Sequence, residues 1–263
     1  KLQNKKKLMN LFTASRLTMR PTPWLELGLS RGMQTQGKGR PGGLGRFMES
    51  FVGQSTNTWG SDLSDDFSAQ VAGFDARIRC PQQWGRCAAY TQWMGEDAAG
   101  KVLPLPYKFM TQWGLEHSWQ GGRHRAFWEY TQTEGNSLPW DDRSTRFPGY
   151  LNGVYVQGYT NFSRWIGAAQ GAGSRVHTLG WMDAHAQHQY KLHWGVVGQS
   201  IGAYVPGVNA PRGQLLGLGW KQHLRWRGFG WTPELAWIRL QEGSDTGVQR
   251  RDSLRLGLTI TSH

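Results

Sequence analysis

The chain has 263 residues, including 36 Gly and 15 Trp, and its formal net charge is +12. No apolar run approaches the ~20 residues of a membrane-spanning helix, and the mean hydropathy of −0.58 is that of a polar chain. This composition favours strands and tight turns over helices, while the positive charge points to nucleic acid, anionic lipid or acidic glycan as partner. Neither value excludes a membrane β-barrel, whose strands alternate and whose loops are polar.

The first residues, KLQNKKKLMNLF, begin with basic side chains but lack the long apolar core and small-residue cleavage site of a signal peptide. A signal that has already been removed and a missing N-terminal part both remain open.

After this segment, runs with period-two alternation predict a series of antiparallel strands. The expected strands are 13–20, 24–34, 67–79, 88–96, 109–119, 126–133, 175–186, 190–200, 213–227, 230–241 and 251–261. A short helix is expected within the first long connection, at 45–52.

Each predicted strand has one apolar and one polar face. A soluble sandwich would point the apolar faces inward, whereas a membrane barrel would turn them toward lipid and line its lumen with the polar faces. In the barrel interpretation the lumen-facing candidates are Asp75, Arg77, Arg79, Lys221, His223, Arg225 and Arg227.

The connections between these strands alternate in length. Short ones are expected at 21–23, around 81–86, and at 121–124, 187–189 and 228–229. Long ones are expected at 35–66, 97–108, 134–174, 201–212 and 242–250. Short turns at one end and long loops at the other are typical of outer-membrane barrels. We therefore expect residues 1–263 to form one barrel domain, and the odd strand number suggests the C-terminal portion of a longer barrel.

Cys80 and Cys87 bracket the short turn PQQWGR. Two cysteines alone cannot complete a tetrahedral zinc site. A pair flanking a turn could form a disulfide in an oxidising compartment, and two free thiols are the alternative.

Two glycine motifs resemble sites of other protein classes. GKGRPG at 37–42 matches the dinucleotide pattern G-x-G-x-x-G, but Gly43 and Gly45 would weaken the helix that must follow. GQSIG at 198–202 matches a nucleophile elbow, but Pro206 and Pro211 oppose the required helix, so Ser200 is expected at a strand end.

The other polar clusters have ordinary structural explanations. His185 and His188 would point to opposite faces of a strand, which suits no shared metal. The acidic pairs 65–66, 96–97 and 141–142 could supply a glycosidase pair, but such residues more often solvate loops or pair with arginine. No nucleic-acid-binding signature occurs. We expect no enzyme, no catalytic residue, no cofactor, no metal and no nucleic-acid partner.

Several segments carry a family resemblance in their order and spacing: QTQGKGRPGGLGRFMESFVG, VAGFDARI, YTQWMGEDAAG, LPYKFMTQWGLEH and RWIGAAQGAGSRVHTLGW. They lie within roughly residues 24–182, the extent of a resemblance to the Wzi family of outer-membrane capsule assembly proteins. The chain departs from the family pattern in GEDAAG, in AAQGAGSR and in its final residues LGLTITSH, which lack a terminal aromatic. These departures concern the exact ligand more than the fold.

The resemblance implies an all-β fold: an antiparallel transmembrane β-barrel in the outer membrane of a Gram-negative bacterium, with long extracellular loops plugging the lumen. Such a protein would act as a lectin that binds anionic capsular polysaccharide at the cell surface, in contact with outer-membrane lipid. GKGRPG then becomes the point where a strand turns into an extracellular loop. The candidate binding residues are Arg40, Arg46, Trp59, Lys108 and Trp140. The alternatives are an anion-selective diffusion pore and a soluble β-sandwich that binds carbohydrate.

Overall fold

The computed structural model describes most of the chain. The described residues are 10–37, 42–52, 68–99, 105–136, 147–151, 155, 158–161, 164–185, 187–198, 213–226, 229–244 and 247–262.

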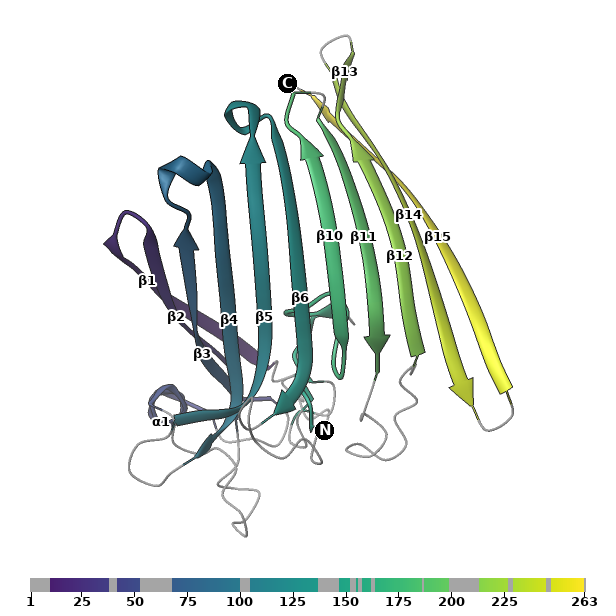
Figure 1. Cartoon of the computed structure of the whole chain (residues 1–263). Coiled ribbons are helices and arrows are strands. Elements are labelled where there is room, and N and C mark those ends of the chain that lie inside the picture. Colours follow the sequence, from purple (N-terminus) through teal and green to yellow (C-terminus); the bar gives the residue numbers. More distant parts are fainter. Residues whose placement is uncertain are drawn as a thin grey trace.

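Long antiparallel strands dominate the structure (Figure 1). They are β1 (Leu11–Thr22), β2 (Leu25–Thr35), β3 (Ala69–Arg79), β4 (Arg86–Ala99), β5 (Leu105–Trp119), β6 (His124–Asn136), β10 (Arg175–Asp183), β11 (His188–Val197), β12 (Gly213–Gln222), β14 (Phe229–Ser244) and β15 (Gly247–Ser262). The short elements are α1 (Leu44–Phe51), β7 (Phe147–Pro148), β8 (Thr160–Asn161), β9 (Arg164–Trp165), β13 (Leu224–Trp226) and the 3-10 turns η1 (Gln82–Trp84) and η2 (Gln120–Gly122).

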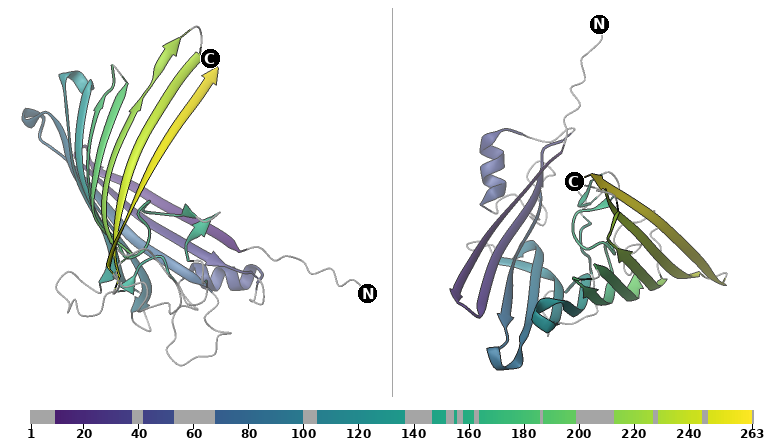
Figure 2. Two further views of the ribbon diagram at one scale, coloured as in Figure 1. Left: turned by 90° about the vertical axis from the view of Figure 1, so that its right-hand side faces the viewer. Right: turned by 90° about the horizontal axis from the view of Figure 1, so that it is seen from above.

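All but β8 and β9 join one 13-stranded sheet, in which each long strand pairs antiparallel with the next along the chain. Within the described residues, β1 pairs with β2 alone and β15 with β14 alone. The sheet curves into an open trough with β1 and β15 at its rims (Figure 2). The all-β antiparallel class expected from the sequence is confirmed, and the alternative of two packed sheets is not what the described strands form.

The strand predictions are confirmed in order, and so is the helix in the first connection. Two predictions were wrong in detail. The strand expected at 213–227 is interrupted at His223, but Leu224–Trp226 continues it in the same register along the start of β14. The long loop expected at 242–250 is mostly strand, since backbone pairing continues out to Ser244 and Gly247. The backbone ladder needs no apolar side chains, so the hydrophobic pattern ends before the strands do.

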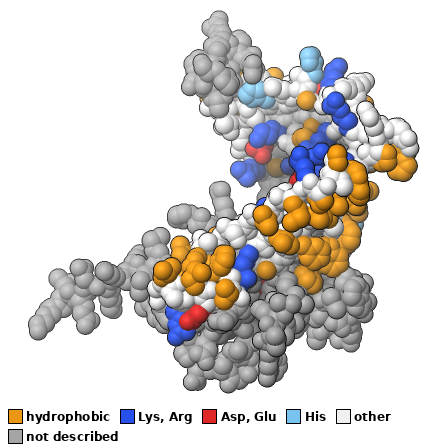
Figure 3. Space-filling model, turned by 90° about the vertical axis from the view of Figure 1, so that its left-hand side faces the viewer, with side chains coloured by type: hydrophobic (Ala, Val, Ile, Leu, Met, Phe, Trp, Pro, Cys, Tyr) orange, Lys and Arg blue, Asp and Glu red, His pale blue; other side chains and the backbone are white. Residues whose placement is uncertain are grey.

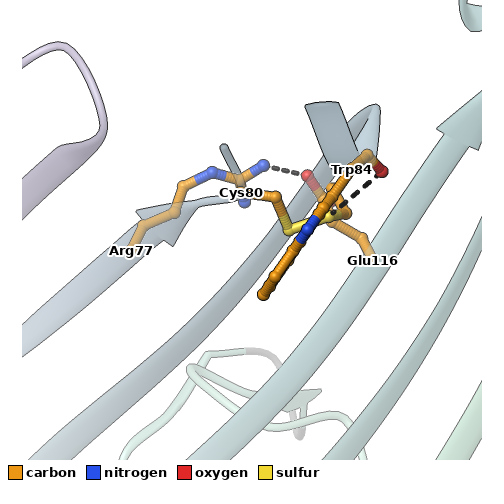
Figure 4. Close-up of a disulfide and its surroundings, with 5 residues drawn as sticks. Arg77, Cys80, Trp84 and Glu116 are labelled. Carbon is orange, nitrogen blue, oxygen red and sulfur yellow. Dashed lines mark hydrogen bonds and ion pairs between the residues drawn. A yellow bond between two sulfur atoms is a disulfide. The ribbon is translucent and has the colours of Figure 1, made fainter. Parts of the chain in front are cut away.

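The two ends of the sheet differ as the sequence indicates. Figure 1 shows the short turns at one end of the sheet and α1 at the other. At the short-turn end, Cys80 and Cys87 form a disulfide across η1 (Figure 4). None of the described helices is long and apolar enough to span a membrane.

The two faces of the sheet have opposite character. The face away from the inner segments is apolar yet exposed; its most exposed members include Leu29, Leu115, Leu218, Leu254 and Leu256. In a soluble protein such a large apolar surface would be covered, so its exposure indicates a surface that faces lipid.

Aromatic rings on the outer face lie in two rows. Near the short turns, ring centroids follow one another at 5.3 to 5.6 Å through Trp119, His124, Trp181 and Tyr190. Nearer the long connections, Tyr130, His177 and Trp194 form a second row. On β5, Trp113 pairs with Tyr130 of the second row, and Trp119 belongs to the first row. The two tryptophans are six positions apart, so the rows are separated by about 20 Å along the strand. This separation approaches the ~25 Å apolar band of outer-membrane strands, which aromatic girdles flank.

The polar face is the inner one, and the described residues between Phe147 and Ser174 pack against it near the end of the sheet that carries α1. Tyr155 and Tyr159 are buried against Ala69 of β3, while Leu151 and Ala172 form a second small core with Trp165. The Tyr155 hydroxyl donates to the Gln36 carbonyl at 3.0 Å. These contacts place an inner layer inside one end of the trough.

Candidate functional site

Glycines on the inner face let aromatic rings lie flat across the sheet. A Cβ on Gly114 would meet the Tyr90 ring at 2.2 Å, and a Cβ on Gly180 would meet the Phe127 ring at 2.1 Å. Each ring therefore occupies the space that a side chain on the neighbouring strand would otherwise fill. The consequence is an inner surface lined by ring faces and short polar groups.

This surface and the inner layer enclose a cavity of about 410 Å³. Its volume lies in the usual range for ligand sites. The cavity is lined by Gln92, Met94, Met110, Thr111, Gln112, Phe127, Glu129, Thr131, Gln132, Thr133, Tyr150, Gly167, Ala168, Ala169, Gln170, Thr178, Lys191 and His193. Amide and hydroxyl groups predominate, and they supply both donors and acceptors.

One row of the cavity wall runs across β6, β10 and β11. Register pairs Glu129 with Thr178 and Thr178 with His193. Thr178 Oγ1 lies 2.9 Å from His193 Nδ1. The Tyr90 hydroxyl donates to Glu129 Oε1 at 2.7 Å, which leaves the other carboxylate oxygen available to a ligand.

The next row lies two residues further toward the short turns. Here register pairs Phe127 with Gly180, Gly180 with Lys191, and Lys191 with Gly219. Both cross-strand neighbours of Lys191 are thus glycines. The ammonium group and the Phe127 ring lie on the same wall of the cavity with no intervening side chain from β10.

The opposite wall comes from the inner layer, which is fixed by buried hydrogen bonds. Thr133, only 1% exposed, donates from its hydroxyl to the Gly171 carbonyl at 2.6 Å and accepts from the Ser174 N–H at 2.8 Å. The Tyr150 N–H donates to the Glu96 carboxylate, and the Tyr150 hydroxyl accepts from the Ala168 N–H at 3.3 Å. Burial raises the pKa of the Tyr150 phenol, so this group stays neutral.

Arginines surround the inner face closer to the short turns. Arg77 and Arg125 both bind the Glu116 carboxylate (Figure 4 shows Arg77 and Glu116 beside the disulfide). Arg16 binds Asp75 at 2.8 Å. Viewed from the β1 side, Lys and Arg side chains gather next to a continuous hydrophobic band (Figure 3). Because two arginines share the single carboxylate of Glu116, this end of the inner face carries more positive than negative charge.

Several residues proposed from the sequence as lumen-facing lie on this inner face. Asp75 and Arg77 of β3 make the ion pairs just described, Arg79 lies 3.9 Å from Glu26, and Lys221 of β12 is exposed. His223 lies outside the strands, and its Nδ1 is 2.8 Å from Thr232 Oγ1. The side chains of Arg225 and Arg227 lie outside the described residues.

The residues proposed from the sequence as glycan-binding are not brought together by the described structure. Arg40, Trp59 and Trp140 lie outside the described residues. Arg46 is exposed on α1 and pairs with Glu49 at 2.8 Å. Lys108 begins the regular part of β5 with a left-handed φ of 57° and does not line the cavity. These residues stay predictions.

Sequence reasoning missed the cavity residues Phe127, Glu129 and Lys191. Each occupies a polar-face position of a predicted strand, but the glycines beside them lie on neighbouring strands and are brought there by the sheet register. Among the described residues, no three His, Cys, Asp or Glu side chains form a group that could hold a metal ion. Ser200 and the acidic pairs at 65–66 and 141–142 lie outside them.

Comparison with known proteins gives a consistent picture. The family model for the capsule assembly protein Wzi matches residues 2–210. An uncharacterised 55.8 kDa protein in the cps region of Klebsiella pneumoniae is 35% identical over 129 residues, which is 46% of this chain and 24% of the relative.

The structure of Wzi, an outer-membrane protein involved in group 1 capsule assembly in Escherichia coli and described as a carbohydrate-binding β-barrel, superimposes with a TM-score of 0.62. Its identity to this chain is 22%, and the match covers 95% of this chain and 51% of that one. The likeness shows the β-barrel fold, and the chain spans about half of that structure and a quarter of the curated relative.

Proposed function

Because the chain belongs to the Wzi family of capsule assembly proteins, we propose that it is an outer-membrane protein of a Gram-negative bacterium that binds capsular polysaccharide and attaches it at the cell surface. The proposal covers binding and attachment, with no catalytic step. Its expected partners are an anionic polysaccharide and the lipid around the strands.

The observation that carries this function is the two-faced sheet with a polar cavity on its inner side. An exposed apolar band with two aromatic rows suits a lipid environment. Within the cavity, side-chain amides and hydroxyls from several strands converge, as needed to replace the water around sugar hydroxyls. A repeating polymer can bind many copies of the protein on one cell. A weak affinity at each site therefore suffices to retain the polymer.

The alternative function, an anion-selective pore, requires an open lumen, whereas a binding protein can have a plugged one. The described residues between Phe147 and Ser174 pack inside the trough at one end, which favours a plugged protein. In planar lipid bilayers we expect no large, stable conductance. Steady steps on the nanosiemens scale with anion preference would favour the pore instead.

The test is capsule retention by cells. A strain lacking the gene should shed polysaccharide into the medium, and a plasmid copy should restore cell-bound polymer. The double variant Arg40→Ala, Arg46→Ala examines the loop arginines; unchanged retention at a normal outer-membrane level would remove them from the site. Equal retention with and without the gene would contradict the function itself.

A further inference from the structure

Lys191 is set apart from the other inner-face cations described above. Arg77 and Arg125 share Glu116, and Arg16 binds Asp75. Lys191, by contrast, has no carboxylate partner among the described residues and lines the cavity. Lys191 is half-buried, and an anionic ligand group bound in the cavity would supply the carboxylate partner that it lacks.

The glycines on both sides of Lys191 keep its surroundings open. Its cross-strand neighbour on β10 is Gly180, and its cross-strand neighbour on β12 is Gly219. A Cβ on Gly219 would lie 3.7 Å from the Lys191 Cβ, so the lysine already borders empty space on that side. On the other side the Phe127 ring extends over Gly180. The Arg125 guanidinium lies 5.8 Å from the centroid of the Phe127 ring, over one of its faces. A sugar ring could rest its C–H groups on the remaining ring surface while a substituent at its edge reaches the ammonium.

From this arrangement we infer that the cavity holds a uronic-acid-type sugar unit, with Lys191 binding the sugar carboxylate and Phe127 packing against the C–H face of its ring. The inference rests on the proposed function and names the site and the residue within it. The cavity volume of about 410 Å³ accommodates one or two sugar rings and no longer stretch of polymer.

The charges of the cavity favour a singly charged acidic group over a doubly charged one. Glu129 lies on the same inner face, one row from Lys191, and its free oxygen can accept a hydrogen bond from a sugar hydroxyl. Adjacent rows on one face are about 7 Å apart. A doubly charged phosphate would bring a second negative charge close to Glu129, which is unfavourable. A ligand with one carboxylate and neighbouring hydroxyls satisfies both groups.

The experiment compares two forms of one polymer. Surface polysaccharide purified from the producing cells is used in its native form and after reduction of its carboxyl groups to alcohols. Binding of each to the full-length detergent-purified protein is measured by calorimetry. The variants are Lys191→Met, Lys191→Arg and, as a matched control, Lys221→Met, which removes an exposed inner-face lysine from outside the cavity.

The wild-type protein should bind native polymer about tenfold or more tightly than reduced polymer, as expected for one charge-assisted hydrogen bond. Lys191→Met should abolish this difference, Lys191→Arg should retain part of it, and Lys221→Met should leave it unchanged. Heat-dependent gel mobility verifies that each variant is folded.

Two failures can be told apart. Equal binding of native and reduced polymer, or an unchanged difference in Lys191→Met, overturns the role of Lys191 while polysaccharide binding stands. Absence of binding to either form by the folded wild-type protein contradicts the proposed function as well.

Discussion

The Tyr90 hydroxyl donates to Glu129 Oε1 at 2.7 Å although the two residues lie on strands β4 and β6, which do not pair with each other. The intervening strand β5 carries Gly114 at the crossing point, and the Tyr90 ring fills the space of the missing Cβ. The bond therefore depends on a glycine as much as on its two partners.

Gly114→Ala should displace the Tyr90 ring and lengthen its bond to Glu129. Overpacking of this kind costs about 1–3 kcal/mol. The matched control is Gly219→Ala, whose new Cβ would meet only the Lys191 Cβ at 3.7 Å and should change stability little. Urea unfolding of the detergent-folded protein gives both values. Equal free energies of unfolding for the two variants would contradict the role of Gly114.

The strands could be predicted because alternation is a local property. Leu25, Leu27 and Leu29 reveal the outer face of β2 without knowledge of any other strand. The strand ends were harder to predict. β14 and β15 pair out to Ser244 and Gly247, past the alternating residues, because a strand ends where pairing with its neighbour ends. Pairing of that kind is not written in the strand's own residues.

The cavity could not be predicted for a related reason. Tyr90 and Glu129 are 39 residues apart, and Thr133 and Ser174 are 41 apart. Such contacts follow from sheet register and from the way the inner layer folds back, which no local pattern encodes. Binding residues sought in the long loops were chosen for their charge or their aromatic ring, whereas the proposed role of Lys191 depends on two glycines on neighbouring strands.

Thr133→Val should loosen the inner layer. The change keeps the volume but leaves the Gly171 carbonyl and the Ser174 N–H without their buried hydroxyl partner. The expected loss is about 1–3 kcal/mol. Hydrogen exchange at residues 171–174 should accelerate in Thr133→Val, whereas Thr133→Ser should retain most of the protection. Identical exchange in the two variants would show that the hydroxyl does not hold this layer.

Cys80 and Cys87 should resist alkylation unless the protein is first reduced, because their sulfur atoms are joined. The enclosed loop is short, so removing the bond should lower the free energy of unfolding by about 2–3 kcal/mol. Mass spectrometry after labelling, with and without reductant, provides the measurement. Labelling of both cysteines in unreduced protein purified from the cell envelope would argue against the bridge.

Leu254 and Ser253 are adjacent on β15 but point to opposite faces, since Leu254 pairs with Trp237 of the outer face and Ser253 with Ile238. Leu254 lies near the middle of its strand and is 65% exposed. If the outer face contacts lipid, Leu254→Arg places a charge near the bilayer midplane at a cost of about 2–4 kcal/mol.

Ser253→Arg adds the same side chain on the inner face and should be tolerated. The folded fraction in outer membranes, measured by heat-dependent gel mobility, should therefore fall for Leu254→Arg only. An equal loss in both variants would indicate that β15 tolerates arginine on neither face, and normal assembly of Leu254→Arg would remove this strand from the lipid surface.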